Sequence, residues 1–213
     1  MSSMFSMGNV QGVKVASSTV YLKAGIHEVT FKGIEMGEKG MEITFENENG
    51  VHRELIFEPR SNERTESQYG PNPSEAEQFM CKIKQIIAAL DPELSANIEK
   101  DGAKFAAPNF AAFVKLLKKY LDAKVGTVTN IKLIPTSGSF VGFPGFPARI
   151  GKEGDLYMST KFIGENLTLT NAEVTRIENA AKATPTDMKA KGSDLEDIKA
   201  EFEAEADEDE LPF

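Results

Sequence analysis

The chain has 213 residues, of which 40% are hydrophobic, and its 24 lysines and arginines against 33 aspartates and glutamates give a formal net charge of −9. This length fits one large domain or two small ones, and because no long apolar run occurs, a transmembrane helix is excluded. A single cysteine, Cys81, excludes an internal disulfide and fits a reducing cytosol, and with only two histidines, His27 and His52, the sequence predicts no metal site and no cofactor.

The N-terminal part predicts a flexible segment followed by a β-meander. Residues 1–18 are rich in Ser, Gly and Met and lack the features of a secretory signal. Beyond them, apolar and polar residues alternate in three stretches separated by turns that contain glycine. Period-two alternation is typical of strands that bury one face, so we expect Phe31, Phe45 and Phe57 in a core. The three strands are predicted over residues 27–34, 41–46 and 51–59.

A helical insert follows a polar segment. Ser74 and Glu77 form the capping box of a first helix, whose apolar stripe places Cys81 near the core. Asp91 followed by Pro92 predicts the start of a second, short helix. Lysines of the third helix are expected on its solvated face. The insert is predicted over 74–121, with helices over 74–90, 91–102 and 109–121.

The remaining elements complete a mostly β fold. A strand is predicted over 128–136, then an irregular loop rich in Gly and Pro, further strands over 156–164 and 167–170, and a helix from Asn171 to Ala181. Three strands, a helical insert and further strands follow the order of the oligonucleotide-binding (OB) fold, a five-stranded barrel. The alternative is an α+β domain with a separate helical lobe. The domains are predicted over 1–18 (flexible), 19–184 (OB-like barrel with helical insert) and 185–213 (disordered tail).

Aromatic and basic residues gather in two segments, in a pattern that favours binding of single-stranded DNA. Such binding stacks bases on aromatic faces, and Lys and Arg contact the phosphates. The alternative for the aromatic loop is a cap over the barrel mouth or a subunit contact, which leaves a homo-oligomer open. The predicted DNA-binding residues are Arg53, Arg60, Arg64 and Tyr69 near the third strand, and Phe140, Phe143, Phe146, Arg149 and Lys152 in and after the loop.

The charge of the chain is concentrated at its C-terminus. Residues 193–213 hold ten acids and one base, a net charge of −9, and leave 23 bases and 23 acids in residues 1–192. Terminal blocks of like charge are typical of disordered interaction tails. A solubility device is the alternative, but a final Leu-Pro-Phe suits a partner's apolar pocket, which can also capture the terminal carboxylate.

The ending of this tail resembles that of bacterial single-stranded DNA-binding proteins, which close an acidic tail with a short Pro-Phe plug. Taken with the predicted body, the chain resembles phage-type single-stranded DNA-binding proteins of replication. The resemblance implies that the chain coats exposed single strands in the cytoplasm of a bacterial host during replication, recombination and repair. It also implies that the tail recruits a polymerase, helicase or nuclease. The tail residues that carry the resemblance are Asp207, Glu208, Asp209, Glu210, Leu211, Pro212 and Phe213.

The sequence predicts no enzyme. It contains no phosphate-binding P-loop, Rossmann fingerprint or nucleophile elbow. A two-metal nuclease, whose acids would converge from strand ends, stays open as a third alternative behind two functions from other classes. The first is a binder of single-stranded DNA without sequence specificity, whose tail competes for the DNA groove. The second is a replisome adaptor that does not bind DNA and acts through its C-terminal tail.

Overall fold

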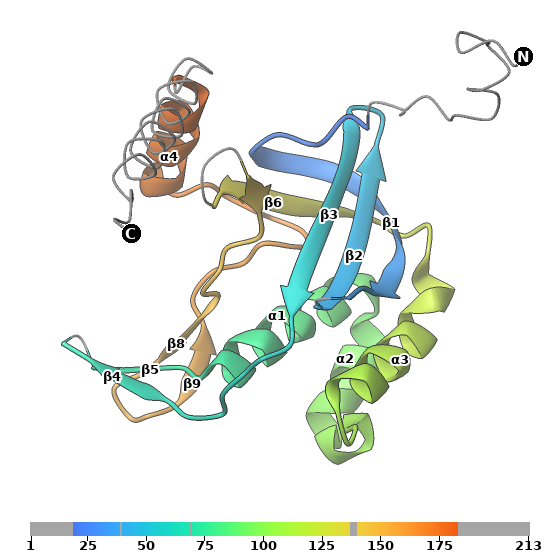
Figure 1. Ribbon diagram of the computed structural model, residues 1–213, viewed down its shortest axis with the longest axis vertical. Coiled ribbons are helices and arrows are strands. Elements are labelled where there is room, and N and C mark those ends of the chain that lie inside the picture. The colour runs from blue at the N-terminus through green and yellow to red at the C-terminus, as the bar shows by residue number, and fades with distance from the viewer. Residues whose placement is uncertain (1–18, 39, 69, 137–139, 183–213) are drawn as a thin grey trace, which may run out of the picture.

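The computed structural model describes residues 19–38, 40–68, 70–136 and 140–182 (Figure 1). Within them the fold is mostly β, with four α-helices, as expected. The predicted flexible segment, the acidic tail with its Leu-Pro-Phe ending, and Tyr69 lie outside the described residues. None of the described helices is both long and apolar enough to cross a membrane.

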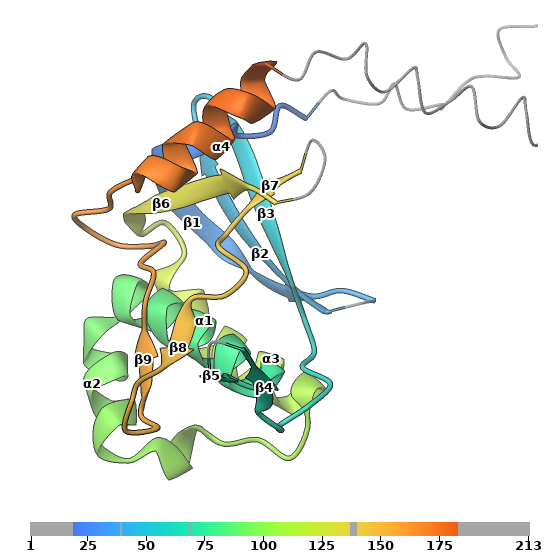
Figure 2. The same ribbon diagram turned by 90° about the vertical axis from the view of Figure 1, so that its left-hand side faces the viewer.

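A five-stranded antiparallel sheet in the order β3-β2-β1-β6-β7 curls into a nearly closed barrel (Figures 1 and 2). The central strand β1 pairs with β2 through Phe31 opposite Phe45, and with β6 through His27 opposite Ile131. A register shift between Phe31 and Gly33 marks a bulge, which bends a strand and increases its twist. The strands are β1 Gly25–Met36, β2 Gly40–Asn47, β3 Gly50–Phe57, β6 Val128–Pro135 and β7 Val141–Gly142.

A side chain joins the two edge strands of this sheet. The backbone N–H of Phe143, directly after β7, donates a hydrogen bond to Glu54 Oε2 of β3 at 3.0 Å. At the other end of β3, Val51 exchanges backbone hydrogen bonds with Val20 and Leu22. The barrel is therefore closed at this point through a carboxylate, without a ladder of backbone hydrogen bonds between β3 and β7.

The predicted alternation is confirmed in all three strands, but the face expected to point inward is wrong in β3. Phe31 and Phe45 are fully buried, whereas Phe57, expected in the core, is 59% exposed. Side chains alternate between the two faces of a strand. In β3 the inward positions hold His52, Glu54 and Ile56, which leaves Phe57 outside.

The predicted helices are confirmed between β3 and β6, and the polar segment before them contains a short hairpin that was not predicted. Ser74 and Glu77 make both hydrogen bonds of the capping box, and the Asp91 side chain caps the second helix ahead of Pro92. Cys81 is buried, and burial raises the pKa of its thiol. The elements are β4 Thr65–Ser67, β5 Gly70–Asn72, α1 Glu75–Leu90, α2 Pro92–Lys100 and α3 Phe110–Leu121, with 3₁₀ turns at Gly102–Phe105 and Asp122–Lys124.

The C-terminal part differs from the prediction. The strand expected over 156–164 shrinks to β9 Leu156–Met158, which pairs with β8 Ala148–Ile150 in a hairpin separate from the barrel sheet. A single bridge joins Ile163 to β6, and the strand expected over 167–170 does not form. Hydrogen bonds between the Gln78 side chain of α1 and the backbone of Ala148 hold β8 against the helix. The β8–β9 hairpin therefore packs on α1 and does not extend the barrel sheet.

The final helix, α4 Asn171–Lys182, forms as predicted and lies beside β6, at the opposite end of the barrel from α1, α2 and α3 (Figure 2). Its cap is Thr170, because Thr170 Oγ1 accepts the backbone N–H of Glu173 and Glu173 Oε2 accepts the backbone N–H of Thr170. Glu173 also forms a buried ion pair of 2.9 Å with Lys132 of β6. Burial raises the pKa of the Glu173 carboxyl, but the hydrogen bonds from Thr170 and Lys132 outweigh it, so the pKa is lowered overall.

Candidate nucleic-acid interface

A groove of about 340 Å³ opens beside the end of β3. Two phenylalanines border it with their side chains largely in solvent, Phe57 at 59% and Phe146 at 70% exposure. The same groove is lined by Leu55 of β3, by Arg60 after β3 and by Lys82 of α1. Exposed aromatic faces beside cationic side chains are the groups that stack bases and bind phosphates.

Local sequence explains why these aromatic side chains face solvent. Leu55 and Phe57 take the outer positions of β3 because the strand alternates, and Pro59 follows directly, where a strand cannot continue its hydrogen bonding. Phe146 lies between Pro144 and Pro147, both of which are buried while Phe146 is not. Proline fixes φ on each side of a short segment, so Phe146 is held in the exposed position.

The charge of the groove is mixed. Arg60 and Lys82 supply positive charge, and Glu58 and Glu75 supply negative charge, with the backbone N–H of Arg60 bound to Glu75 Oε2 at 2.8 Å. Partial burial lowers the pKa of the Lys82 ammonium, and the nearby Glu54 carboxylate acts in the opposite direction. A phosphate beside Lys82 would stabilise its charged form in the same way. The groove therefore favours stacking over purely electrostatic binding.

The β8–β9 hairpin adds a second aromatic and basic pair. Arg149 lies directly opposite Tyr157, which is 47% exposed. Leu156 and Met158 line an apolar groove with α1, so Tyr157 and its partner Arg149 point away from the helix. Within the described residues neither Arg149 nor Lys152, at the tip of the hairpin, is engaged in an ion pair.

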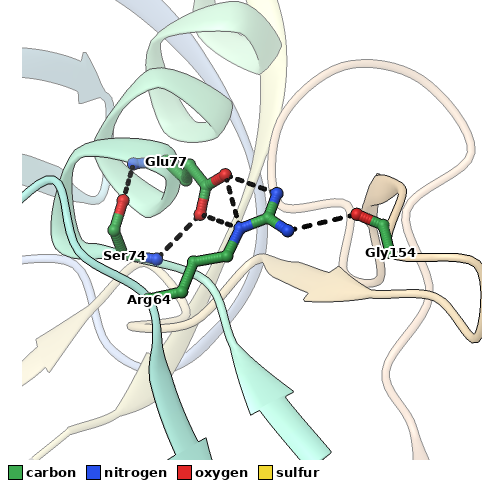
Figure 3. Close-up of polar contacts among 4 residues, drawn as sticks. All are labelled: Arg64, Ser74, Glu77 and Gly154. Atoms are coloured by element: carbon green, nitrogen blue, oxygen red, sulfur yellow. Dashed lines mark hydrogen bonds and ion pairs between the residues drawn. The ribbon is translucent and has the colours of Figure 1, made fainter.

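The guanidinium of Arg64 contacts two segments that lie far apart in the sequence (Figure 3). Its guanidinium makes a bidentate contact with Glu77, with Nη2 at 2.7 Å from Oε1, and donates to the backbone carbonyl of Gly154 at 3.2 Å. The hydrogen bond from Glu77 raises the pKa of Arg64, and the same bond lowers the pKa of Glu77. Arg64 therefore links the start of α1 to the β8–β9 hairpin, and its own donors are largely occupied.

The structure separates the remaining predicted residues. Phe140 is 72% exposed, as a stacking platform requires, but Phe143 is 1% exposed and packs in the core, so it offers no face to a base. Arg53 lies on the outer face of β3 and pairs with Glu42 at 3.9 Å. The prediction of three exposed phenylalanines is thus corrected to two, because Phe143 fills the gap between β7 and β3.

Three residues of the interface were absent from the sequence prediction: Phe57, Lys82 and Tyr157. The exposure of Phe57 could have been found from the alternation of β3: if His52 is placed inward, every second residue up to Ile56 points inward and Phe57 points outward. Lys82 follows Phe79 by three residues on α1, which places both at the same groove. Tyr157 is found only through its register with Arg149.

A second groove, of about 960 Å³, is lined by α1, α2, residues of β1 and β6 and the segment after β9, and it does not suit a polyanion. Its lysines are engaged, Lys84 with Glu99 at 3.0 Å and Lys161 with the carbonyl of Glu165 at 2.7 Å. Glu28 adds a further negative charge to the lining. Elsewhere, no cluster of His, Cys, Asp and Glu among the described residues has the grouping of a metal site.

Comparison with family models, with curated proteins and with solved structures gives no match for this chain.

Proposed function

We propose that the chain binds single-stranded DNA without sequence specificity. The observation that carries this proposal is the pair of exposed phenylalanines, Phe57 and Phe146, which line one groove together with Arg60 and Lys82. Stacking on such platforms is worth about 1–3 kcal/mol per base and tolerates any base, because every base has a π-face.

The architecture supports the same proposal. The barrel has its helices inserted between the third and fourth strands of the sheet, which is the layout of an OB-fold, here with an enlarged insert. OB-folds bind oligonucleotides on the face of strands two and three and in the loop between strands four and five. Leu55 and Phe57 are on the outer face of the third strand, and exposed Phe140 follows the fourth.

The acidic tail completes the proposed function. Residues 193–213, with the Leu-Pro-Phe ending, would recruit a polymerase, helicase or nuclease to the DNA-bound protein, as bacterial single-stranded DNA-binding proteins do through a similar ending. In this role the body binds the strand and the tail binds a protein, so removal of the tail should leave the DNA site intact.

Fluorescence anisotropy with a labelled thymidine oligonucleotide tests the proposal, with a duplex of equal length as the comparison. We expect saturable binding of the single strand and much weaker binding of the duplex, because a paired base has no free face for Phe57 or Phe146. Equal affinity for both forms, or no affinity for either, would reject a stacking site. The absence of any DNA binding would instead favour the adaptor that acts through the tail.

A further inference from the structure

We infer that Glu54 is the positioning residue of the aromatic loop, defined here as residues 140–146. Its carboxylate holds the backbone of Phe143 against β3 and so fixes Phe140 and Phe146 in solvent on either side. The inference rests on the proposed function, since it assigns a role within the same DNA site. Glu54 is buried and is not among the residues that line the groove.

The carboxylate of Glu54 lies in a buried polar cluster under the loop. Its Oε2 accepts the backbone N–H of Phe143 at 3.0 Å and lies 3.0 Å from Nε2 of His52. Glu54 is 8% exposed and His52 is 4% exposed. Hydrogen bonds to a charged acceptor are stronger than neutral ones, and an unpaired buried donor is costly, so this cluster holds the loop firmly.

Ring packing supports the same geometry from the other side. The centroid of the Phe143 ring lies 4.5 Å from that of Phe162, 5.3 Å from that of His52 and 6.0 Å from that of Phe45. Phe143 is thus anchored by its backbone to β3 and by its side chain to the core. Because the anchor is central, the exposed phenylalanines three residues before and after it project away from the core.

Gly142 allows the carboxylate to come this close. A β-carbon built on Gly142 would lie 3.0 Å from Glu54 Oε2, which is tighter than ordinary contact. The Glu54 carboxylate has little freedom to move because it is buried and makes two hydrogen bonds, one with Phe143 and one with His52. A side chain at this position would therefore displace the carboxylate or the loop. Gly145 of the same loop has no atom within 4 Å of its built β-carbon.

The same carboxylate also acts on the groove. Glu54 raises the pKa of Lys82, against the lowering by partial burial. Other charges at the groove are Glu58 and Arg60 after β3 and Glu75 of α1. One buried group thus supports both the aromatic and the cationic part of the proposed DNA site.

Amide hydrogen exchange of Phe143, followed by NMR in the free protein, tests the hydrogen bond directly. Glu54→Ala should accelerate hydrogen exchange of the Phe143 amide by about tenfold or more, because it removes a charge-assisted hydrogen bond. The exchange rates of amides in the core strands should stay unchanged. Glu48→Gln removes an exposed acid from the adjoining turn and should leave the amide unchanged. If Glu54→Ala does not fold, Gly142→Ala should give faster exchange at Phe143, with Gly145→Ala as the matched control.

A double-mutant cycle tests the positioning role. Glu54→Ala should weaken binding of the thymidine oligonucleotide by about tenfold, and Phe146→Ala added to it should cost much less than in the wild-type chain. Phe57→Ala, on β3 and outside the loop, should cost nearly the same in both backgrounds. Glu54→Gln keeps an acceptor for Phe143 and should restore part of the affinity.

The two hypotheses fail in different ways. A wild-type chain that ignores oligothymidine rejects the proposed function, while the exchange measurement still decides whether Glu54 holds Phe143. Unchanged Phe143 exchange in both Glu54→Ala and Gly142→Ala overturns the inference. Strict additivity of Glu54→Ala with Phe146→Ala overturns it as well, even if every variant binds DNA more weakly.

Discussion

Replacing Phe57 and Phe146 together by alanine should remove most of the affinity for single-stranded DNA. Both rings are more than half exposed, so each can offer a face to one base. At about 1–3 kcal/mol per stacked base, the double variant should lose about 2–6 kcal/mol, or about 30-fold to about 10⁴-fold in the dissociation constant. Substitutions of exposed residues change folding stability by about 0.5 kcal/mol at most, so thermal unfolding should move little.

Anisotropy with a labelled thymidine oligonucleotide measures this loss, and circular dichroism measures the unfolding. Tyr21→Ala is the matched control, because Tyr21 is 60% exposed and its backbone bridges to Val51, at the opposite end of β3 from Phe57. That end is about 20 Å away along the strand. If the double variant binds within about threefold of wild type, or if Tyr21→Ala costs as much, the groove is not the stacking site.

Four further outcomes follow from the same structure. A plot of the logarithm of the binding constant against the logarithm of the salt concentration should have a slope no steeper than about −3, since four basic residues border the interface: Arg60, Lys82, Arg149 and Lys152. A much steeper slope in the anisotropy titration would indicate a second phosphate path. Deleting residues 193–213 should tighten DNA binding at low salt if the tail competes for the groove, and an unchanged dissociation constant would reject that competition. Arg64→Ala should raise the pKa of Glu77 towards 4.5 in an NMR titration and increase proteolysis of the β8–β9 hairpin, whereas an unshifted Glu77 would contradict the assigned contact. Lys132→Met should cost about 3–5 kcal/mol in denaturant unfolding, since it leaves Glu173 buried without its cation. Because the folded pKa of Glu173 is lowered, Glu173 contributes stability above about pH 4.5 that is lost as pH falls through the folded value; the variant should show a smaller dependence, since only the hydrogen bonds with Thr170 remain to lower that pKa.

Elements set by local chemistry could be predicted from the sequence. The capping box of Ser74 and Glu77 and the Asp91–Pro92 start of α2 each involve residues at most three apart, so the residues themselves define the element. The alternation of β1 and β2 is equally local, and Phe31 and Phe45 are buried as expected. The order of three strands, helices and a fourth strand is confirmed as well. The fifth barrel strand, β7, was not predicted, because it lies in the segment expected as an irregular loop.

Elements set by distant contacts could not be predicted. Residues 148–158 form a hairpin that packs on α1, because Gln78 makes a hydrogen bond to the backbone of Ala148, 70 residues away. Nothing in the local sequence pattern indicates that partner. The burial of Phe143 has the same origin, since its partner Glu54 lies 89 residues earlier. Glycine and proline around the loop indicated irregular backbone but not which of its phenylalanines turns inward.

Strand β3 explains both wrong predictions of burial, the core position expected for Phe57 and the exposed position expected for Phe143. Its inward face carries the polar pair His52 and Glu54, and its outward face carries Leu55 and Phe57, the reverse of what apolar patterning predicts. The inward pair is satisfied because Glu54 Oε2 lies 3.0 Å from Nε2 of His52 and accepts the backbone N–H of Phe143, and the outward apolar residues line a groove. A slip of one residue in the pairing of β3 with β2 would exchange the two faces, burying Phe57 and exposing the carboxylate that anchors the loop. Local rules are expected to fail where a strand serves a site as well as its own packing, and β3 is the strand on which the proposed groove and its anchor both depend.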